Sequence, residues 1–142
     1  MIVLDTNVLS ELARPRPAVQ VVRWVDSQDP TQLAVTAVTA AEIRAGIELM
    51  PSGRRRDDIE RRMDQLLTGA FDRRVYPFDA GSSGHYARAV ATRTRSGHPI
   101  GALDAQIAAI CLQHGAELAT RNTDDFTGVG LTVINPWDQT EV

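Results

Sequence analysis

The sequence contains no lysine, so all 15 of its basic residues are arginines. This absence excludes every mechanism that needs an active-site lysine. The single cysteine, Cys111, excludes an internal disulfide and any zinc site made of several thiolates. Because Cys111 lies in an apolar run over residues 107–112, we expect a small buried core residue rather than a nucleophile.

Aromatic residues make up only 5% of the chain, which argues against a surface on which nucleic-acid bases stack. The formal net charge is -3, so any contact with RNA must come from local basic patches or from a bound cation. No stretch approaches the ~20 apolar residues of a membrane span, and the first residues carry no signal-peptide pattern. We therefore expect a cytoplasmic protein with no membrane partner.

The chain alternates between short apolar runs and amphipathic stretches with helical periodicity. This alternation predicts an α/β fold in which helices cover both faces of a parallel sheet. The spacing of Val19, Val22 and Val25 predicts the second helix. We expect one domain over residues 1–136 and a peripheral tail over 137–142. Strands are expected at 2–4, 33–36, 74–78, 117–120 and 131–134.

Acidic residues recur where the predicted strands end and the predicted helices begin. Asp5 follows the first strand, Glu42 falls in the first turn of the helix after the second strand, and Asp104 opens a later helix. A further acidic pair, Asp124 and Asp125, follows the strand that ends near residue 120. In an open parallel sheet these strand ends form the ligand crevice, so we expect the acids to converge there.

Each acid also has a purely structural interpretation. Asp5 would cap its helix, Glu42 would complete a capping box with Thr39, and Asp104 would interact with a helix dipole. Together the acids favour a site, because two carboxylates ~4 Å apart repel by about 4 kcal/mol at an effective dielectric of ~20. Without lysine, a cation or a proton must compensate this repulsion. Ligands that are all oxygen favour Mg²⁺ or Mn²⁺ over zinc.

Four segments of the chain resemble the motifs of PIN-domain ribonucleases, in particular those of the VapC- and FitB-like toxins. The resemblance runs from residue 1 to about residue 136, and the motifs follow one another in the family's order. The segments are MIVLDTNVLSE at 1–11, TAVTAAEIRAG at 36–46, IGALDAQIAA at 100–109 and LATRNTDDF at 118–126.

The resemblance implies a three-layer α/β/α sandwich with a central parallel sheet of four to five strands. It also implies a Mg²⁺-dependent endoribonuclease, with Mn²⁺ as an alternative ion, that is held inactive by a VapB- or FitA-like antitoxin. Asp5, Glu42 and Asp104 are the implied metal-binding and catalytic carboxylates.

The fourth ligand of the implied site has three candidates. Some family members carry an acid where this chain has Asn122, and others use the acid before the phenylalanine, which is Asp125. Asn122 can still ligate through its carbonyl oxygen, more weakly than a carboxylate. Asp125 is preferred over the neighbouring Asp124.

Three further residues are predicted to support the site. Thr6 is expected to orient Asp5 through a hydroxyl hydrogen bond, and Asn7 is a lesser candidate for the same role. Arg121 lies beside the fourth motif and is the basic residue that we place nearest to the scissile phosphate.

The resemblance also implies partners. In this family the antitoxin commonly inserts a basic side chain into the acidic pocket, toxin chains pair as homodimers, and operator DNA is bound only through the antitoxin. Helices over 18–27 and 39–50 are predicted to form an apolar groove for an antitoxin helix. The arginine-rich stretch 54–64 also contains acids, so we interpret it as a solvated face with opposite-sign pairs.

Three other classes of protein are weighed against this interpretation. A receiver-like phosphoacceptor domain also gathers acids but relies on a lysine. A structure-specific DNA nuclease shares the metal chemistry, but this short chain lacks a helical clamp insertion. The third class is a catalytically weak binding partner, whose acidic pocket receives an antitoxin peptide within a DNA-binding repressor complex. The sequence distinguishes this class from a ribonuclease only poorly, because the same acidic pocket serves both.

Overall fold

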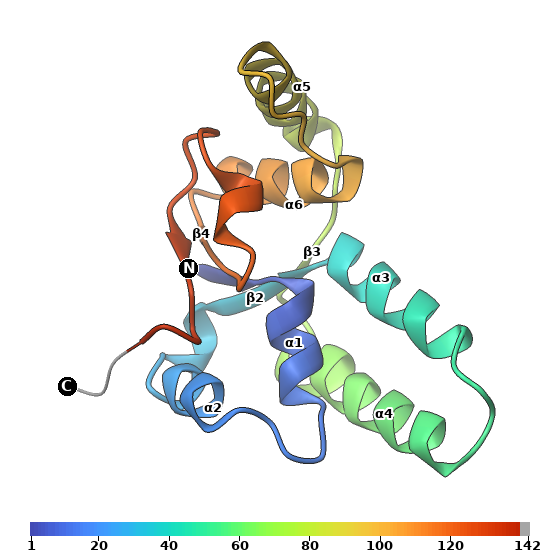
Figure 1. Cartoon of the computed structure of the whole chain (residues 1–142). Coiled ribbons are helices and arrows are strands. Elements are labelled where there is room, and N and C mark those ends of the chain that lie inside the picture. The colour runs from blue at the N-terminus through green and yellow to red at the C-terminus, as the bar shows by residue number, and fades with distance from the viewer. Residues whose placement is uncertain (140–142) are drawn as a thin grey trace.

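A sheet of five parallel strands lies at the centre of the computed structural model, which describes residues 1–139 (Figure 1). The strand order is β3-β2-β1-β4-β5, so β1 is the central strand and the predicted parallel sheet is confirmed. The two edge strands, β3 and β5, are shorter than the sequence predicted. The strands are β1 (Ile2–Leu4), β2 (Leu33–Thr36), β3 (Val75–Tyr76), β4 (Glu117–Ala119) and β5 (Val133–Ile134).

The register of the sheet brings the ends of two distant segments together. Leu4 of β1 pairs with Ala119 of β4, so the residues that follow them, Asp5 and Thr120, are neighbours at the carboxyl edge. The chain passes from β1 to β2 on one side of the sheet and reaches β4 on the other. The edge between β1 and β4 is therefore the topological switch point, where open α/β sheets bind ligands.

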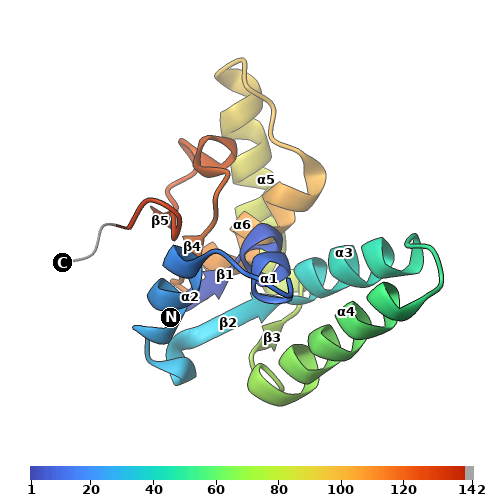
Figure 2. The same cartoon turned by 60° about the horizontal axis from the view of Figure 1, so that its bottom comes forward.

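Helices cover both faces of the sheet, which confirms the three-layer sandwich (Figures 1 and 2). One core cluster joins the sheet to α1, α2, α3 and α4, and a second cluster joins it to α6. Helix α5 packs against α6 and lies farthest from the sheet, at the top of Figure 1. The helices are α1 (Thr6–Leu12), α2 (Val19–Asp26), α3 (Ala37–Glu48), α4 (Arg54–Gln65), α5 (Ala80–Arg95) and α6 (Ala102–Gln113).

Helix α6 supplies much of one core cluster because its middle, over residues 107–111, is buried. Ile107, Ile110 and Cys111 are all inaccessible to solvent. Burial raises the pKa of the Cys111 thiol to about 12, which keeps it protonated and unreactive. The prediction that Cys111 is a core residue is confirmed.

The buried face of α2 differs from the one that its valine spacing suggested. Val19 is 59% exposed, whereas Val21 and Trp24 are buried against the first core cluster. A strict spacing of three drifts around a helix that has 3.6 residues per turn. Val21, Trp24 and Val25 follow the helical period and form the inward side.

The start of α3 corrects the predicted capping box. The helix begins at Ala37, and its cap is Thr36, the last residue of β2, whose hydroxyl accepts a hydrogen bond from the Thr39 amide at 3.0 Å. Strand and helix therefore join without a loop. Thr39 lies inside the first turn, and Glu42 lies in the second turn rather than the first.

The end of the described chain is attached to the domain. Trp137, on the tail side of the predicted boundary at residue 136, packs against the first core cluster. The Arg121 guanidinium lies 5.0 Å from the centre of the Trp137 ring. Residues 140–142 of the predicted tail lie outside the described residues. Within residues 1–139, no helix is long and apolar enough to cross a membrane.

Candidate metal centre

The predicted acids lie at the carboxyl edge of the sheet, each on a different segment. Asp5 follows β1, Glu42 is on α3, Asp104 is in the first turn of α6, and Asp125 is in the short 3-10 helix Thr123–Phe126. Partial burial and then the negative charges of Asp5, Asp125 and Glu42 raise the pKa of Asp104 to about 6. The four carboxylates are therefore electrostatic neighbours, as the strand-end pattern predicted.

Asp5 is the most deeply placed acid of the group and is only 5% exposed. Its Oδ2 accepts a hydrogen bond of 2.7 Å from the Thr120 hydroxyl, and its Oδ1 accepts one of 2.8 Å from the Thr6 amide. Burial raises the pKa of Asp5, these two hydrogen bonds oppose the rise, and the charge of Asp125 adds to it. Asp5 is also the cap of α1, so its structural interpretation is correct as well.

Thr120 is a central residue of the site to which the sequence pattern assigned no role. It is fully buried, and its hydroxyl oxygen accepts hydrogen bonds from the Asn7 side chain at 3.2 Å and the Asn122 amide at 3.1 Å. Asn7 in turn accepts a hydrogen bond of 3.1 Å from the Arg121 amide. The sequence could have indicated Thr120 by its position alone, because Thr120 directly follows β4 as Asp5 directly follows β1.

Replacing Thr120 by valine is expected to lower the free energy of unfolding by about 1–3 kcal/mol, because the buried Asp5 carboxylate loses a donor. Urea denaturation of the metal-free protein measures this loss. Thr127→Val is the matched control, since Thr127 is exposed. Equal stability of the two variants would contradict the role assigned to Thr120.

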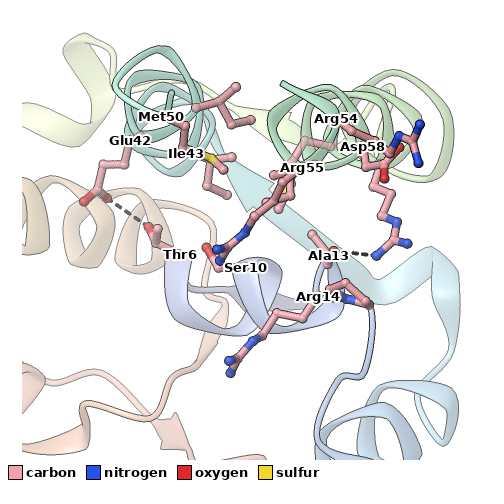
Figure 3. A pocket seen from close by; sticks show the side chains of 16 residues that line it. Thr6, Ser10, Ala13, Arg14, Glu42, Ile43, Met50, Arg54, Arg55 and Asp58 are labelled. Carbon is pink, nitrogen blue, oxygen red and sulfur yellow. Dashed lines mark hydrogen bonds between the residues drawn. The ribbon is translucent and has the colours of Figure 1, made fainter. Parts of the chain in front are cut away.

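Thr6 connects the second acid to the first. Its hydroxyl was expected to bond Asp5, but it donates instead to Glu42 Oε1 at 2.9 Å, and only its backbone amide serves Asp5 (Figure 3). The Thr39 hydroxyl lies 3.1 Å from that of Thr6. The prediction failed because Glu42, one turn farther along α3 than expected, faces the start of α1.

The three candidates for the fourth position differ in their surroundings. The charge of Asp125 raises the pKa of both Asp5 and Asp104. All three side chains are exposed, and Asn122 begins the 3-10 helix with its amide bonded to Thr120. Asp125 is therefore the candidate whose charge acts on the other acids.

The donor set of this edge suits a hard divalent cation. Within residues 1–139, no group of three or more acidic, histidine or cysteine side chains is already arranged as a metal-binding cluster. The neighbouring carboxylates nevertheless raise the pKa of Asp5 and of Asp104, all four acids offer only oxygen, and the chain has no lysine to neutralise them.

The raised pKa of Asp104 predicts how the stability of the metal-free protein depends on pH. Its folded pKa of about 6 lies above the ordinary aspartate value of 3.8, so the folded state binds more protons than the unfolded state between these values. The free energy of unfolding therefore falls as the pH rises through this window. Asp104→Asn is expected to be more stable than the parent above pH 7, by roughly 1 kcal/mol for a half-exposed group, with no difference below about pH 4.

Thermal denaturation in a chelator at pH 4 and pH 7.5 measures this effect. Asp57→Asn is the matched control, because Asp57 is an exposed acid on α4. A stability gain that was the same at both pH values would contradict an origin in charge repulsion.

A groove with a volume of about 780 Å³ opens beside Glu42, between α1 and the helical hairpin of α3 and α4 (Figure 3). Its lining within the described residues comes from these helices and the segments next to them, and none comes from α2. The predicted groove between helices 18–27 and 39–50 is wrong in this respect, because the apolar face of α2 is used in the core. The apolar lining includes Ile43, Ile47, Met50, Ile59 and Met63.

The two ends of the groove are chemically different. Figure 3 shows the Thr6–Glu42 hydrogen bond at one end. At the other end, Arg62 of α4 donates a hydrogen bond of 3.1 Å to the Ala13 carbonyl of the chain after α1. Arg55 points from α4 toward α1 across the groove. The groove therefore leads from a basic rim to the acidic edge of the sheet.

Opposite charges are paired on α4, as its composition predicted. Arg61 bonds Asp58 at 2.7 Å within the helix. Arg44 of α3 bonds Asp64 of α4 at 2.9 Å, which ties the hairpin together. These exposed pairs contribute little stability individually.

The five-stranded parallel sheet and the carboxylates at its switch point define a class of small α/β domain with an acidic site at the carboxyl edge. Residues 2–130 match the family model described as PIN domain. The chain belongs to the PIN-domain family, and the family predicted from the four sequence motifs is confirmed.

Individual relatives cover nearly the whole chain. A protein named VapC ribonuclease Y4jK from Sinorhizobium fredii is 44% identical over 97% of this chain and 99% of its own length. Toxin FitB from Neisseria gonorrhoeae is 38% identical over 96% of this chain and 99% of its own length. A solved structure of FitAB bound to an IR36 DNA fragment is similar with a TM-score of 0.91 and 38% identity, covering 99% of each chain.

Proposed function

We propose that this chain is the toxin of a VapBC-type toxin–antitoxin module and acts as a Mg²⁺-dependent endoribonuclease, with Mn²⁺ as an alternative ion. One observation carries the proposal: acids from four separate segments lie at a single sheet edge, where the charges of Asp5, Asp125 and Glu42 act on Asp104. The relatives named VapC ribonuclease and Toxin FitB support it, since their similarity extends over the whole domain.

In this proposal Asp5, Glu42, Asp104 and Asp125 hold the cation. When bound, such an ion lowers the pKa of a water ligand and neutralises the charge that develops on the phosphate. The chain's own contribution is to keep the ligands oriented. Hydrogen bonds from the Thr120 hydroxyl and the Thr6 amide orient the Asp5 carboxylate, and a hydrogen bond from the Thr6 hydroxyl orients Glu42.

The substrate would be bound through its phosphates rather than its bases, because the chain has few aromatic residues. Arg121 is the basic residue that we assign to this contact. Its amide is anchored to Asn7 beside Asp5, and its guanidinium rests over the Trp137 ring. Stacking limits the conformations of the guanidinium and leaves its edge available to a phosphate.

The protein that binds in the groove would be a VapB- or FitA-like antitoxin. An amphipathic helix fits an apolar groove of this size, and a basic side chain at its end would reach Glu42 and the neighbouring acids. The related FitAB complex is bound to DNA. We assign operator contacts to the antitoxin alone and expect toxin chains to pair, as the family resemblance implies.

Cleavage of single-stranded RNA by the protein freed of antitoxin tests the proposal. We expect cleavage with Mg²⁺ or Mn²⁺ and none with excess chelator. A protein that binds its antitoxin but never cuts RNA would be the catalytically weak binding partner, and that result would overturn the enzymatic part of the proposal.

A further inference from the structure

The Arg93 side chain links two loops at the edge of the acidic site. Arg93 lies near the end of α5, the helix packed on the outside of α6. Its Nε donates a hydrogen bond of 2.7 Å to the His98 carbonyl. Its Nη1 donates to the Asp125 carbonyl at 2.6 Å and lies 3.3 Å from the Thr127 carbonyl. One guanidinium thus connects segments that are 27 or more residues apart in the chain.

Both linked segments carry acids of the candidate metal centre. The loop that contains His98 leads to Gly101, which caps α6 three residues before Asp104. The other segment is the 3-10 helix that contains Asp125 itself. The position of Arg93 therefore influences where Asp104 and Asp125 stand relative to each other.

The 3-10 helix has few other anchors near Asp125. The buried ring of Phe126 fixes its inner side in the second core cluster. The Asp125 amide bonds the Asn122 carbonyl at 3.1 Å within the turn. The bond from Arg93 to the Asp125 carbonyl ties the outer side of the turn to the α5–α6 unit.

The chemistry of the guanidinium suits this role. Arginine presents several donors in a rigid plane, so one side chain can bind two backbone segments in a fixed orientation. Its positive charge also compensates part of the negative charge of the acids. Burial and the neighbouring carboxylates raise the pKa of Asp104, and the charge of Arg93 lowers it. A lysine would keep the charge but lose the planar arrangement of donors.

We propose that Arg93 is a positioning residue that holds the Asp125 turn and the start of α6 in the arrangement at which their carboxylates share one divalent cation. The inference rests on the proposed function for the identity of that cation. The structural link between the two loops stands independently of it. Arg93 acts through backbone carbonyls and is not itself a ligand.

The test compares Arg93→Gln and Arg93→Lys with Arg88→Gln, a control at an exposed arginine on the same helix. Mn²⁺ affinity is measured by calorimetry, and amide hydrogen exchange of residues 122–128 is measured in the metal-free protein. We expect Arg93→Gln to bind Mn²⁺ about 10–100-fold more weakly, as for other residues that orient metal ligands. Exchange in 122–128 should rise, while the control behaves as the parent.

Cleavage kinetics separate positioning from general damage to the fold. At a Mn²⁺ concentration well below its Kd, we expect the kcat of Arg93→Gln to fall by about the same factor as metal affinity, with the KM for a short RNA changed less than about twofold. Arg93→Lys should remain impaired, because the charge alone does not recreate the two-segment link. Full recovery by lysine, or unchanged Mn²⁺ affinity in Arg93→Gln, would overturn the inference.

The outcome distinguishes this inference from the proposed function. If the parent protein bound no Mn²⁺ and cut no RNA, the proposed function would fail, while hydrogen exchange would still report on the link between the loops. If the parent bound Mn²⁺ and cut RNA but Arg93→Gln matched it in affinity and exchange, only the role of Arg93 would fail.

Discussion

Replacing Asp104 by asparagine is expected to reduce RNA cleavage by roughly 1,000-fold, and Asp5→Asn is expected to have the same effect. A loss of this size corresponds to about 4 kcal/mol of transition-state stabilisation, within the range that a bound cation supplies. Both variants should remain folded because asparagine has nearly the same shape as aspartate, although Asp5→Asn also replaces one of the two oxygens that accept hydrogen bonds from Thr120 and the Thr6 amide and so costs some stability.

The reason is the balance of charge at the sheet edge. The pKa of Asp104 is raised by burial and by three other acids, so its charged form is costly unless a cation is present. An amide removes the repulsion and also weakens the attraction for the cation. Catalysis therefore falls while the metal-free protein gains stability, and this combination is unusual for a substitution in a folded domain.

Initial rates on a labelled RNA at saturating Mg²⁺, together with thermal scans in chelator, measure both effects. Asp57→Asn, at an exposed position on α4, is the control for the loss of one negative charge. Asp104→Asn cutting at the parent rate would remove Asp104 from the site.

Replacing Gly46 by phenylalanine is expected to weaken antitoxin binding at least 100-fold, or about 3 kcal/mol. Gly46 lies on α3 and lines the groove, and a Cβ placed there meets no atom within 4 Å. The added side chain therefore starts in open space rather than against the toxin's own atoms. It would occupy the space that the antitoxin helix needs.

Gly46→Ala is the matched control. It removes the helix-interior glycine, which stabilises α3 by up to about 1 kcal/mol, but adds only one methyl group to the groove. We expect the alanine variant to bind antitoxin nearly as the parent does. Titration calorimetry with the antitoxin measures both, and tight binding by Gly46→Phe would place the antitoxin elsewhere.

The sequence was sufficient to predict the sheet and the acids because both follow from local rules. Apolar β-branched runs mark buried strands, and parallel strands end at one edge. Asp5 and Asp104, which directly follow a strand or open a helix, could therefore be placed together. The four motifs located the same residues independently through family resemblance.

The details that sequence could not supply depend on contacts between distant segments. Thr120 serves Asp5 because β1 and β4 are adjacent, and Arg93 reaches the Asp125 carbonyl because α5 lies outside α6. The cap of α3 was misplaced because two threonines, Thr36 and Thr39, both fit a capping pattern. Only the direct junction of β2 with α3 separates them.

The lining of the groove also could not be predicted from the sequence. Apolar stripes on helices predict burial, but they do not say whether the core or a partner covers them. On α2 the stripe is used in the core, whereas α3 presents part of its apolar side to the groove. This distinction requires the packing of α1 against the hairpin.

A crystal of the antitoxin-free protein soaked in Mn²⁺ tests the central claim most directly, because anomalous scattering locates the ion. We predict an anomalous peak within about 2.5 Å of carboxylate oxygens of both Asp5 and Asp104. A fully soaked crystal with no peak at this edge, or with Asp5 and Asp104 bound to separate ions on different surfaces, would contradict the account.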